Sequence, residues 1–298
     1  MDRISKSDFN SLLYPKPETT EYTRAIENPV YITDSSTGIS YATYTLNGQS
    51  TNVPLVAFLS WSVGVENRPG RSDVKALSDH YDGPLIVIDH EATGKSENPS
   101  RSWRQQASFD CLAASRMRVL GSLGVDNFHV AGFSMGGVVA AKVAELARER
   151  AKSLTTVSTV SFSQTNLGQF GFNFLIREGL RQTKYVREAP QSIRDEAYAG
   201  FAGEFKSLPT LLKFYRLMGA SIVPQAIQNL SESTKWQDYV GSKEKVTDWK
   251  DHLKVVRDRN KLVPRSSKLY VLSGESHSWG VYSNSVATII DFSIKTSN

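Results

Sequence analysis

Three short apolar runs constrain the fold of this chain most strongly, because each is unbroken and each ends at a turn-forming residue. Residues 55–59 precede Ser60, residues 85–88 precede Asp89, and residues 128–131 precede Gly132. Strands that are apolar on both faces are typical of a parallel sheet covered by helices on both sides. Because the runs alternate with segments of helical spacing, the sequence predicts an α/β fold.

We expect a mostly parallel sheet of about eight strands flanked by helices. The alternating segment 38–46 and the segment 28–33 before it predict an opening hairpin. The same reasoning predicts further strands at 154–162, 236–240 and 268–272, and helices at 109–123, 136–151, 249–261 and 284–294.

The alternation of strands and helices stops between residues 163 and 234, where helical segments rich in aromatic residues take its place. We interpret residues 163–234 as an inserted helical cap, or lid. The core then comprises residues 1–162 and 235–298, of which residues 1–25 are expected to be an N-terminal extension.

The segment Gly132-Phe133-Ser134-Met135-Gly136 lies between a predicted strand and a predicted helix. A strand, a Gly-x-Ser-x-Gly turn and a helix form the context of a nucleophile elbow, in which small neighbours let the chain turn sharply around an exposed serine. Ser134 is therefore the candidate nucleophile. The helix that follows would direct backbone N–H groups toward its hydroxyl.

A serine hydroxyl needs a neighbouring base, and the chain has five histidines. His80 lies in a predicted surface helix, His90 follows a strand, His129 lies within a strand and His252 lies on a helix, so we expect each to have a structural role. His277 differs, since it lies in the loop between a strand and the last helix. Catalytic groups of open α/β sheets collect in such loops, so His277 is the candidate base.

These features together resemble the α/β-hydrolase superfamily, over roughly residues 28–296. The elbow Gly-Phe-Ser-Met-Gly-Gly is especially similar to those of esterases, monoacylglycerol-type lipases and cofactor-free haloperoxidases. The resemblance implies the chain order nucleophile, acid, histidine. It disfavours an epoxide hydrolase or haloalkane dehalogenase, since those relatives carry aspartate where Ser134 stands.

Two registers compete for the acid between Ser134 and His277. The segment 260–264 imitates the family pattern but places an asparagine at the acid position, with too few residues left for a helix and a strand before His277. The segment 239–248 places Glu244 there and leaves enough residues. We therefore prefer Glu244, with Asp248 and Asp258 as alternative acids; Asp248 also fits a helix N-cap.

An oxyanion hole needs two donors. The backbone N–H of Met135, the residue after the nucleophile, is expected to supply one. By register with the family, Ser62 in the loop after residues 55–59 supplies the other, although Ser60-Trp61 stand where relatives carry His-Gly. The segment Asp89-His90-Glu91-Ala92-Thr93-Gly94-Lys95-Ser96 is similar to a further family turn, with Glu91 in place of its arginine, and we assign it no catalytic role.

The resemblance implies acyl transfer in two steps at a Ser134, His277 and Glu244 triad, acting on a carboxylic ester, thioester or lactone of a small hydrophobic substrate. Carbon–carbon bond hydrolysis or acyl transfer on the same triad stays open, and so does a ligand-binding protein without turnover. Aromatic and neighbouring residues are expected to line the substrate pocket: Trp61, Phe133, Phe170, Phe174, Phe214 and Trp279.

Composition narrows the class of protein further. The chain has 298 residues, a net charge of +5 and a single cysteine, Cys111, so a disulfide within the chain is excluded and we expect Cys111 to be buried. The basic residues are dispersed, which argues against a nucleic-acid partner. No segment has the length of a membrane span. We expect a cytoplasmic protein without a cofactor or metal, and the oligomeric state stays open.

Overall fold

The computed structural model describes residues 18–60, 64–163, 221–244, 246–275 and 283–297, and residues 168, 172, 209, 210, 213, 216 and 217 within the predicted cap. Its described strands form one eight-stranded sheet in the order β1-β2-β4-β3-β5-β6-β7-β8. The first hairpin pairs antiparallel and all pairs from β4 to β8 are parallel. The predicted α/β class and mostly parallel sheet are confirmed. The strands are β1 Val30–Asp34, β2 Ile39–Leu46, β3 Leu55–Phe58, β4 Leu85–Ile88, β5 Phe128–Phe133, β6 Ala151–Val157, β7 Lys235–Gly241 and β8 Ser267–Leu272.

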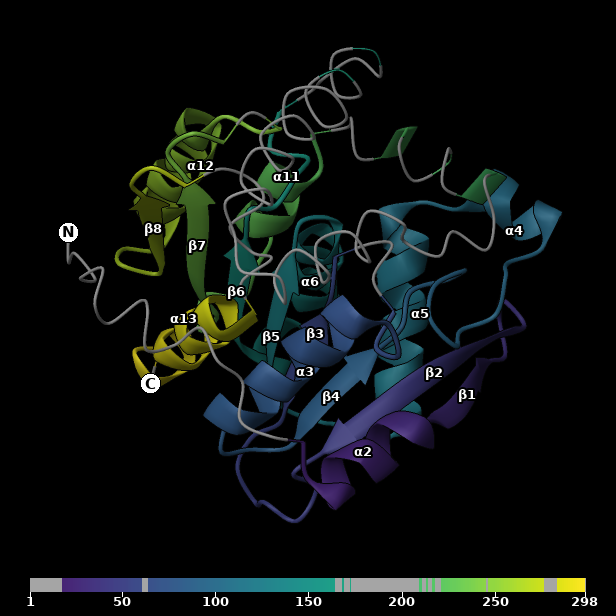
Figure 1. Cartoon of the computed structure of the whole chain (residues 1–298). Helices are drawn as coiled ribbons and strands as arrows, with labels where there is room; N and C mark the ends of the chain where they lie inside the picture. The colour runs from purple at the N-terminus through teal and green to yellow at the C-terminus, as the bar shows by residue number, and fades with distance from the viewer. Residues whose placement is uncertain are drawn as a thin grey trace.

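Helices cover both faces of this sheet (Figure 1). One face carries α2 Thr20–Glu27, α3 Arg68–His80 and α13 Ser283–Lys295, and the other carries α5 Phe109–Ser122, α6 Met135–Ala147, α11 Val223–Gln228 and α12 Trp249–Leu262. The short helices α4 Arg101–Gln106 and η1 Arg148–Arg150 complete the described set. No helix among the described residues is both long enough and apolar enough to cross a membrane.

Side chains of β3 and β4 alternate between the two faces, as the period of a strand requires. In β3, Leu55 and Ala57 join the core cluster under α2, α3 and α13, whereas Val56 and Phe58 join the cluster under α5 and α6. Every residue of β3 and β4 is buried. Burial on both faces explains why these runs are apolar without interruption.

Four expectations need correction. The strand predicted at 154–162 is Ala151–Val157, because Ser158 and Ser161 have φ angles of +44° and +66°, which end the extended backbone.

Residues 20–25, assigned to an extension, begin α2, whose Tyr22 and Ile26 are buried. The end of the predicted cap belongs to the core, since Val223, Ala226 and Ile227 of α11 lie in the main core cluster. Cys111 is exposed rather than buried.

Candidate active site

Ser134 lies at the sharp turn between β5 and α6. Its φ is +53° and its ψ is −117°, a conformation that side chains with a Cβ rarely adopt. Its backbone N–H donates to the carbonyl of Val157 on the neighbouring strand β6 (2.9 Å), and its own carbonyl accepts from the N–H of Gly137 (3.1 Å). Two hydrogen bonds therefore hold a strained serine at the carboxyl edge of the sheet.

The glycines on either side of Ser134 are required by close backbone contacts. A Cβ on Gly132 would lie 2.2 Å from the carbonyl oxygen of Gly136, and a Cβ on Gly136 would lie 2.3 Å from the carbonyl oxygen of Leu59. These distances are well below a normal contact. The elbow thus packs its own backbone against itself and against the end of β3, which explains the Gly-x-Ser-x-Gly spacing.

Helix α6 begins at Met135, directly after Ser134. The first backbone N–H groups of a helix have no partner within the helix, and its N-terminus carries a partial positive charge. The N–H of Met135 therefore belongs to the set of donors that an oxyanion beside Ser134 could use. This arrangement suits the donor role expected for Met135.

Glu244 follows β7 at the same edge of the sheet. It is 6% exposed, and its Oε1 accepts a hydrogen bond from the backbone N–H of Val246 (2.9 Å). The two alternative acids differ from it. Asp248 is exposed and caps α12 by accepting from the N–H of Lys250 (3.0 Å), while Asp258 lies on α12 and pairs with Lys261 (2.7 Å).

A buried hydrogen-bonded chain lies beside the loop that carries Glu244. Thr156 donates to Oδ1 of Asp238 (2.7 Å), and Oδ2 of Asp238 accepts from Nδ1 of His252 (2.6 Å). In the neutral ring, Nε2 of His252 then accepts from the hydroxyl of Thr247 (3.0 Å). Thr247 is three residues after Glu244, so this chain fixes the acid loop to β6, β7 and α12.

The loops after β7 and β8 are joined by three hydrogen bonds. The N–H of Ser242 donates to the backbone carbonyl of Leu272 (2.8 Å), and the N–H of Lys243 donates to the backbone carbonyl of Glu275 (2.7 Å). The N–H of Gly274 donates to Oγ of Ser242 (2.9 Å). The residue before Glu244 is thereby bonded to Glu275. His277, the predicted base, follows Glu275 by two positions in the sequence and lies outside the described residues.

Several other predicted site residues also lie outside the described residues. Phe133 is described: it is half-buried and packs against the small cluster of Val157, Tyr239 and Ile289. It also lines an apolar cavity of about 20 Å³ with Leu59, which is too small for a substrate. The undescribed set is Trp61, Ser62, Phe170, Phe174, Phe214 and Trp279.

Three of the histidines expected to have a structural role are buried and hydrogen-bonded. His252 bonds Asp238 and Thr247 as above, Nδ1 of His129 lies 2.8 Å from the hydroxyl of Ser153, and Nε2 of His90 lies 2.9 Å from the carbonyl oxygen of Leu59. Burial lowers the pKa of His129 to about 4 and, with the charge of Arg116, lowers the pKa of His90 to about 4.

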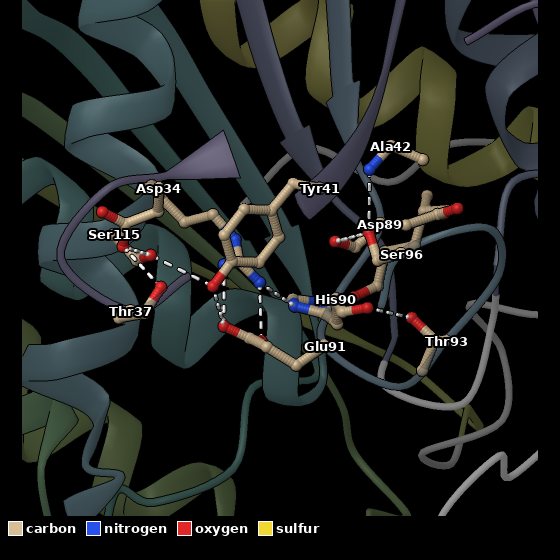
Figure 2. A network of polar contacts seen from close by, with 12 residues as sticks. Asp34, Thr37, Tyr41, Ala42, Asp89, His90, Glu91, Thr93, Ser96 and Ser115 are labelled. Carbon is tan, nitrogen blue, oxygen red and sulfur yellow. Dashed lines mark hydrogen bonds and ion pairs between the residues drawn. The ribbon is translucent and has the colours of Figure 1, made fainter. Parts of the chain in front are cut away.

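The turn after β4 belongs to a polar network that sequence reasoning missed (Figure 2). Arg116 of α5 donates two hydrogen bonds to Glu91 (2.9 and 2.8 Å), and the hydroxyl of Tyr41 donates a third (2.7 Å). Although burial opposes ionisation, the charge and hydrogen bonds of Arg116 hold the pKa of Glu91 below its usual value. The only signal in the sequence was the acid that replaces the arginine of the family turn.

Metal-ligating side chains are not clustered within the described part of the chain, where no group of three or more His, Cys, Asp or Glu residues is placed to hold a metal ion. The described site therefore consists of a strained serine, the N-terminus of a helix and a buried carboxylate. These parts suit attack on an electrophilic carbon with stabilisation of the resulting oxyanion.

Comparisons with known proteins address the fold and the family. A family model described as alpha/beta hydrolase fold matches residues 74–278. The protein named "Putative carbamate hydrolase RutD" of Azorhizobium caulinodans is 31% identical over 115 residues, which are 39% of this chain and 40% of that protein. An acetyltransferase component of an acetoin cleaving system from Pseudomonas putida is 29% identical over 147 residues, 49% of this chain and 36% of that protein.

The matches thus span well under half the length of both curated relatives. Among solved structures, one from a study of carboxylesterases of the thaumarchaeon Nitrososphaera gargenis superposes with a TM-score of 0.68 at 16% identity. The superposition covers 90% of this chain and 98% of that chain. At this identity the likeness concerns the fold.

Proposed function

Because this chain belongs to the alpha/beta hydrolase fold family, we propose that it is a serine hydrolase in which Ser134 attacks the carbonyl carbon of a substrate. The observation that carries the proposal is the strained Ser134 between β5 and the N-terminus of α6. A buried serine held at positive φ by hydrogen bonds and flanked by glycines in close backbone contact serves no evident packing purpose. Strain of this kind collects at functional sites.

In the proposed reaction, His277 removes the proton from the Ser134 hydroxyl as the oxygen attacks, and the carbonyl oxygen becomes an oxyanion. The N–H of Met135 and the N–H of Ser62 bind that oxyanion. His277 then protonates the leaving group, and water attacks the acyl-enzyme to release the acid and free Ser134. Glu244 accepts a hydrogen bond from His277 and stabilises its charged form.

The support for Glu244 over the other acids is its burial and its bond to the N–H of Val246. A carboxylate held away from solvent keeps one orientation, whereas the exposed Asp248 already caps a helix and Asp258 pairs with a lysine. The bonds from Ser242 and Lys243 to the loop after β8 bring the acid loop and the segment that leads to His277 together.

The proposed substrate class is a carboxylic ester, thioester or lactone with a small hydrophobic acyl part. The named relatives include a carbamate hydrolase and an acetyltransferase component, and a neighbouring structure comes from work on carboxylesterases, so all three involve carbonyl chemistry. Acyl transfer and carbon–carbon hydrolysis use the same groups. Product analysis with and without an added alcohol acceptor separates acyl transfer from hydrolysis.

A fluorophosphonate probe tests the proposal directly, since it phosphonylates an activated serine. We expect a single adduct on Ser134, identified by mass spectrometry, and none in Ser134→Ala. Ser161→Ala is the matched control, because Ser161 is also buried, also has positive φ and follows the neighbouring strand. No labelling of the wild type would reject the hydrolase proposal in favour of a binding protein, and labelling that persists in Ser134→Ala would reject Ser134 as the nucleophile.

Ester hydrolysis then tests the roles proposed for His277 and Glu244. A panel of p-nitrophenyl esters of increasing acyl length defines the substrate class, and Ser134→Ala and His277→Ala should each lower kcat by ~10⁴-fold. Glu244→Gln should lower kcat by a factor on the order of 10³ to 10⁴, whereas Asp248→Asn and Asp258→Asn should leave it within about threefold. The opposite ranking would assign the acid to one of the two aspartates.

A further inference from the structure

The loop that follows β3 is held at both ends by two consecutive residues from the turn after β4. At its start, Nε2 of His90 lies 2.9 Å from the carbonyl oxygen of Leu59. At its end, the N–H of Val65 donates to Oδ1 of Asp89 (2.8 Å). Both anchors are buried, with His90 1% exposed and Asp89 2% exposed. The chain between these ends includes Ser60 and Gly64.

The contact between Arg116 and Nδ1 of His90 places the ring proton of the neutral imidazole on Nε2. Nη2 of Arg116 lies 3.5 Å from Nδ1 of His90, and a guanidinium can only donate. Nδ1 must therefore accept, so Nε2 carries the hydrogen and donates it to Leu59. Arg116 is itself fixed by its two hydrogen bonds to Glu91, and Figure 2 shows Glu91 beside His90 in this arrangement.

The carbonyl of Leu59 also borders the nucleophile elbow. A Cβ on Gly136 would lie 2.3 Å from that oxygen, so the end of β3 lies directly against the first turn of α6. The residue before this turn is Ser134. A group that fixes the position of Leu59 therefore fixes the start of the following loop relative to the nucleophile.

We propose that His90 is a positioning residue for the nucleophile elbow: through its hydrogen bond to Leu59 it sets the distance between the end of β3 and the N-terminus of α6, where Met135 carries the proposed oxyanion donor. The inference rests on the proposed hydrolase function. The turn after β4 would then have a role in positioning the site as well as in the fold. The buried pair of Glu91 and Arg116 would contribute by selecting the tautomer of His90.

The consequence is kinetic. An oxyanion donor acts on the transition state, so a displaced donor lowers kcat more than it changes KM. Displacements of about 1 Å in an active site can lower rates by roughly 100-fold. Loss of the His90 bond should therefore lower kcat and the rate of phosphonylation together, while substrate affinity changes little.

Replacement of His90 separates this role from packing. His90→Gln carries an amide N–H near the position of Nε2 and should retain kcat within about threefold. His90→Leu fills the site without a donor and should lower kcat and the phosphonylation rate on the order of 10- to 100-fold with KM within about threefold. His129→Leu is the matched control, because His129 is also buried but bonds Ser153 on β6; it should keep wild-type kcat.

The outcomes of this test are distinguishable. If the wild type labels at Ser134 and a folded His90→Leu retains wild-type kcat, or His129→Leu loses as much, the positioning role is rejected and the hydrolase proposal stands. If the wild type does not label, the hydrolase proposal itself fails. Should His90→Leu not fold by circular dichroism, His90→Asn replaces it, since its shorter amide cannot reach Leu59; equal activity of the Asn and Gln variants would likewise reject the role.

Discussion

The buried ion pair between Glu91 and Arg116 offers a test of the core by a double-mutant cycle. Both side chains are fully shielded from solvent, and two hydrogen bonds of 2.8 and 2.9 Å join them. Arg116 also lies over the ring of Tyr41, 4.3 Å from its centroid. The variants are Glu91→Leu, Arg116→Met and the pair together, each of similar volume to the residue replaced.

The expected change in the free energy of unfolding depends on which buried group each variant leaves without its partner. Glu91→Leu leaves a buried guanidinium without its counter-ion. That group cannot lose its proton, and its Nε has no hydrogen-bond partner among the described residues, so the free energy of unfolding should fall by about 3–5 kcal/mol. Arg116→Met leaves a carboxyl that can take up a proton and still bond Tyr41, so its effect should be smaller and should shrink at low pH. The double variant removes both charges and should lie within about 1 kcal/mol of the wild type.

The assay is urea unfolding followed by tryptophan fluorescence, since Trp236 is fully buried. We expect the two single effects to exceed the effect of the double variant, with a coupling energy of at least about 2 kcal/mol. Additive effects, or a loss below about 1 kcal/mol in Glu91→Leu, would show that solvent or another group compensates the charge, and the reasoning would be wrong.

Three further outcomes follow from described contacts. Gly136→Ala places a Cβ against the carbonyl of Leu59, so it should lower the free energy of unfolding by about 1–3 kcal/mol and slow phosphonylation, measured by urea unfolding and probe kinetics. Burial lowers the pKa of His90 from 6.5 to about 4, so the neutral ring stabilises the folded protein fully above pH 6.5. About 3 kcal/mol of this stabilisation should be lost as the pH falls to 4. Urea unfolding at pH 7 and pH 4 should show this loss in the wild type and not in His90→Gln. Thr247→Val leaves Nε2 of His252 unpaired and should destabilise by about 1–3 kcal/mol in the same assay, whereas Thr247→Ser should not.

The strands of the core could be predicted because their signal is local. In β3 and β4 every residue is buried, so the apolar runs are unbroken and end where the strands end, within one residue. The elbow was equally visible, since the glycines that its backbone contacts require are adjacent in sequence to Ser134. In both cases the constraint and the residues that satisfy it occupy the same short segment.

The errors have the opposite origin. Val160 and Phe162 are buried and apolar, which resembles a strand, but they belong to a loop whose turns occur at Ser158 and Ser161. Cys111 lies on the exposed side of α5, next to the buried Leu112 and Ala113. Hydrophobicity identifies burial, and it does not distinguish a buried loop from a strand.

The polar networks could not be predicted from the sequence, for a further reason. Asp238 meets His252 at a separation of 14 residues and Glu91 meets Arg116 at a separation of 25. The two partners of each pair lie on different elements, so only the packed fold brings these side chains together. Glu244 could be chosen as the candidate acid from register alone, whereas its burial and its hydrogen bond to Val246 came from the structure.

The anchored ends of the loop after β3 bear on how this fold can be redesigned. Because Leu59 and Val65 are each held by a partner outside the loop, the residues between them can be exchanged as a cassette without shifting the points of attachment. If the proposed function holds, a library confined to residues 60–63, built on an unchanged Asp89 and His90, should alter substrate preference while Ser134 stays in place.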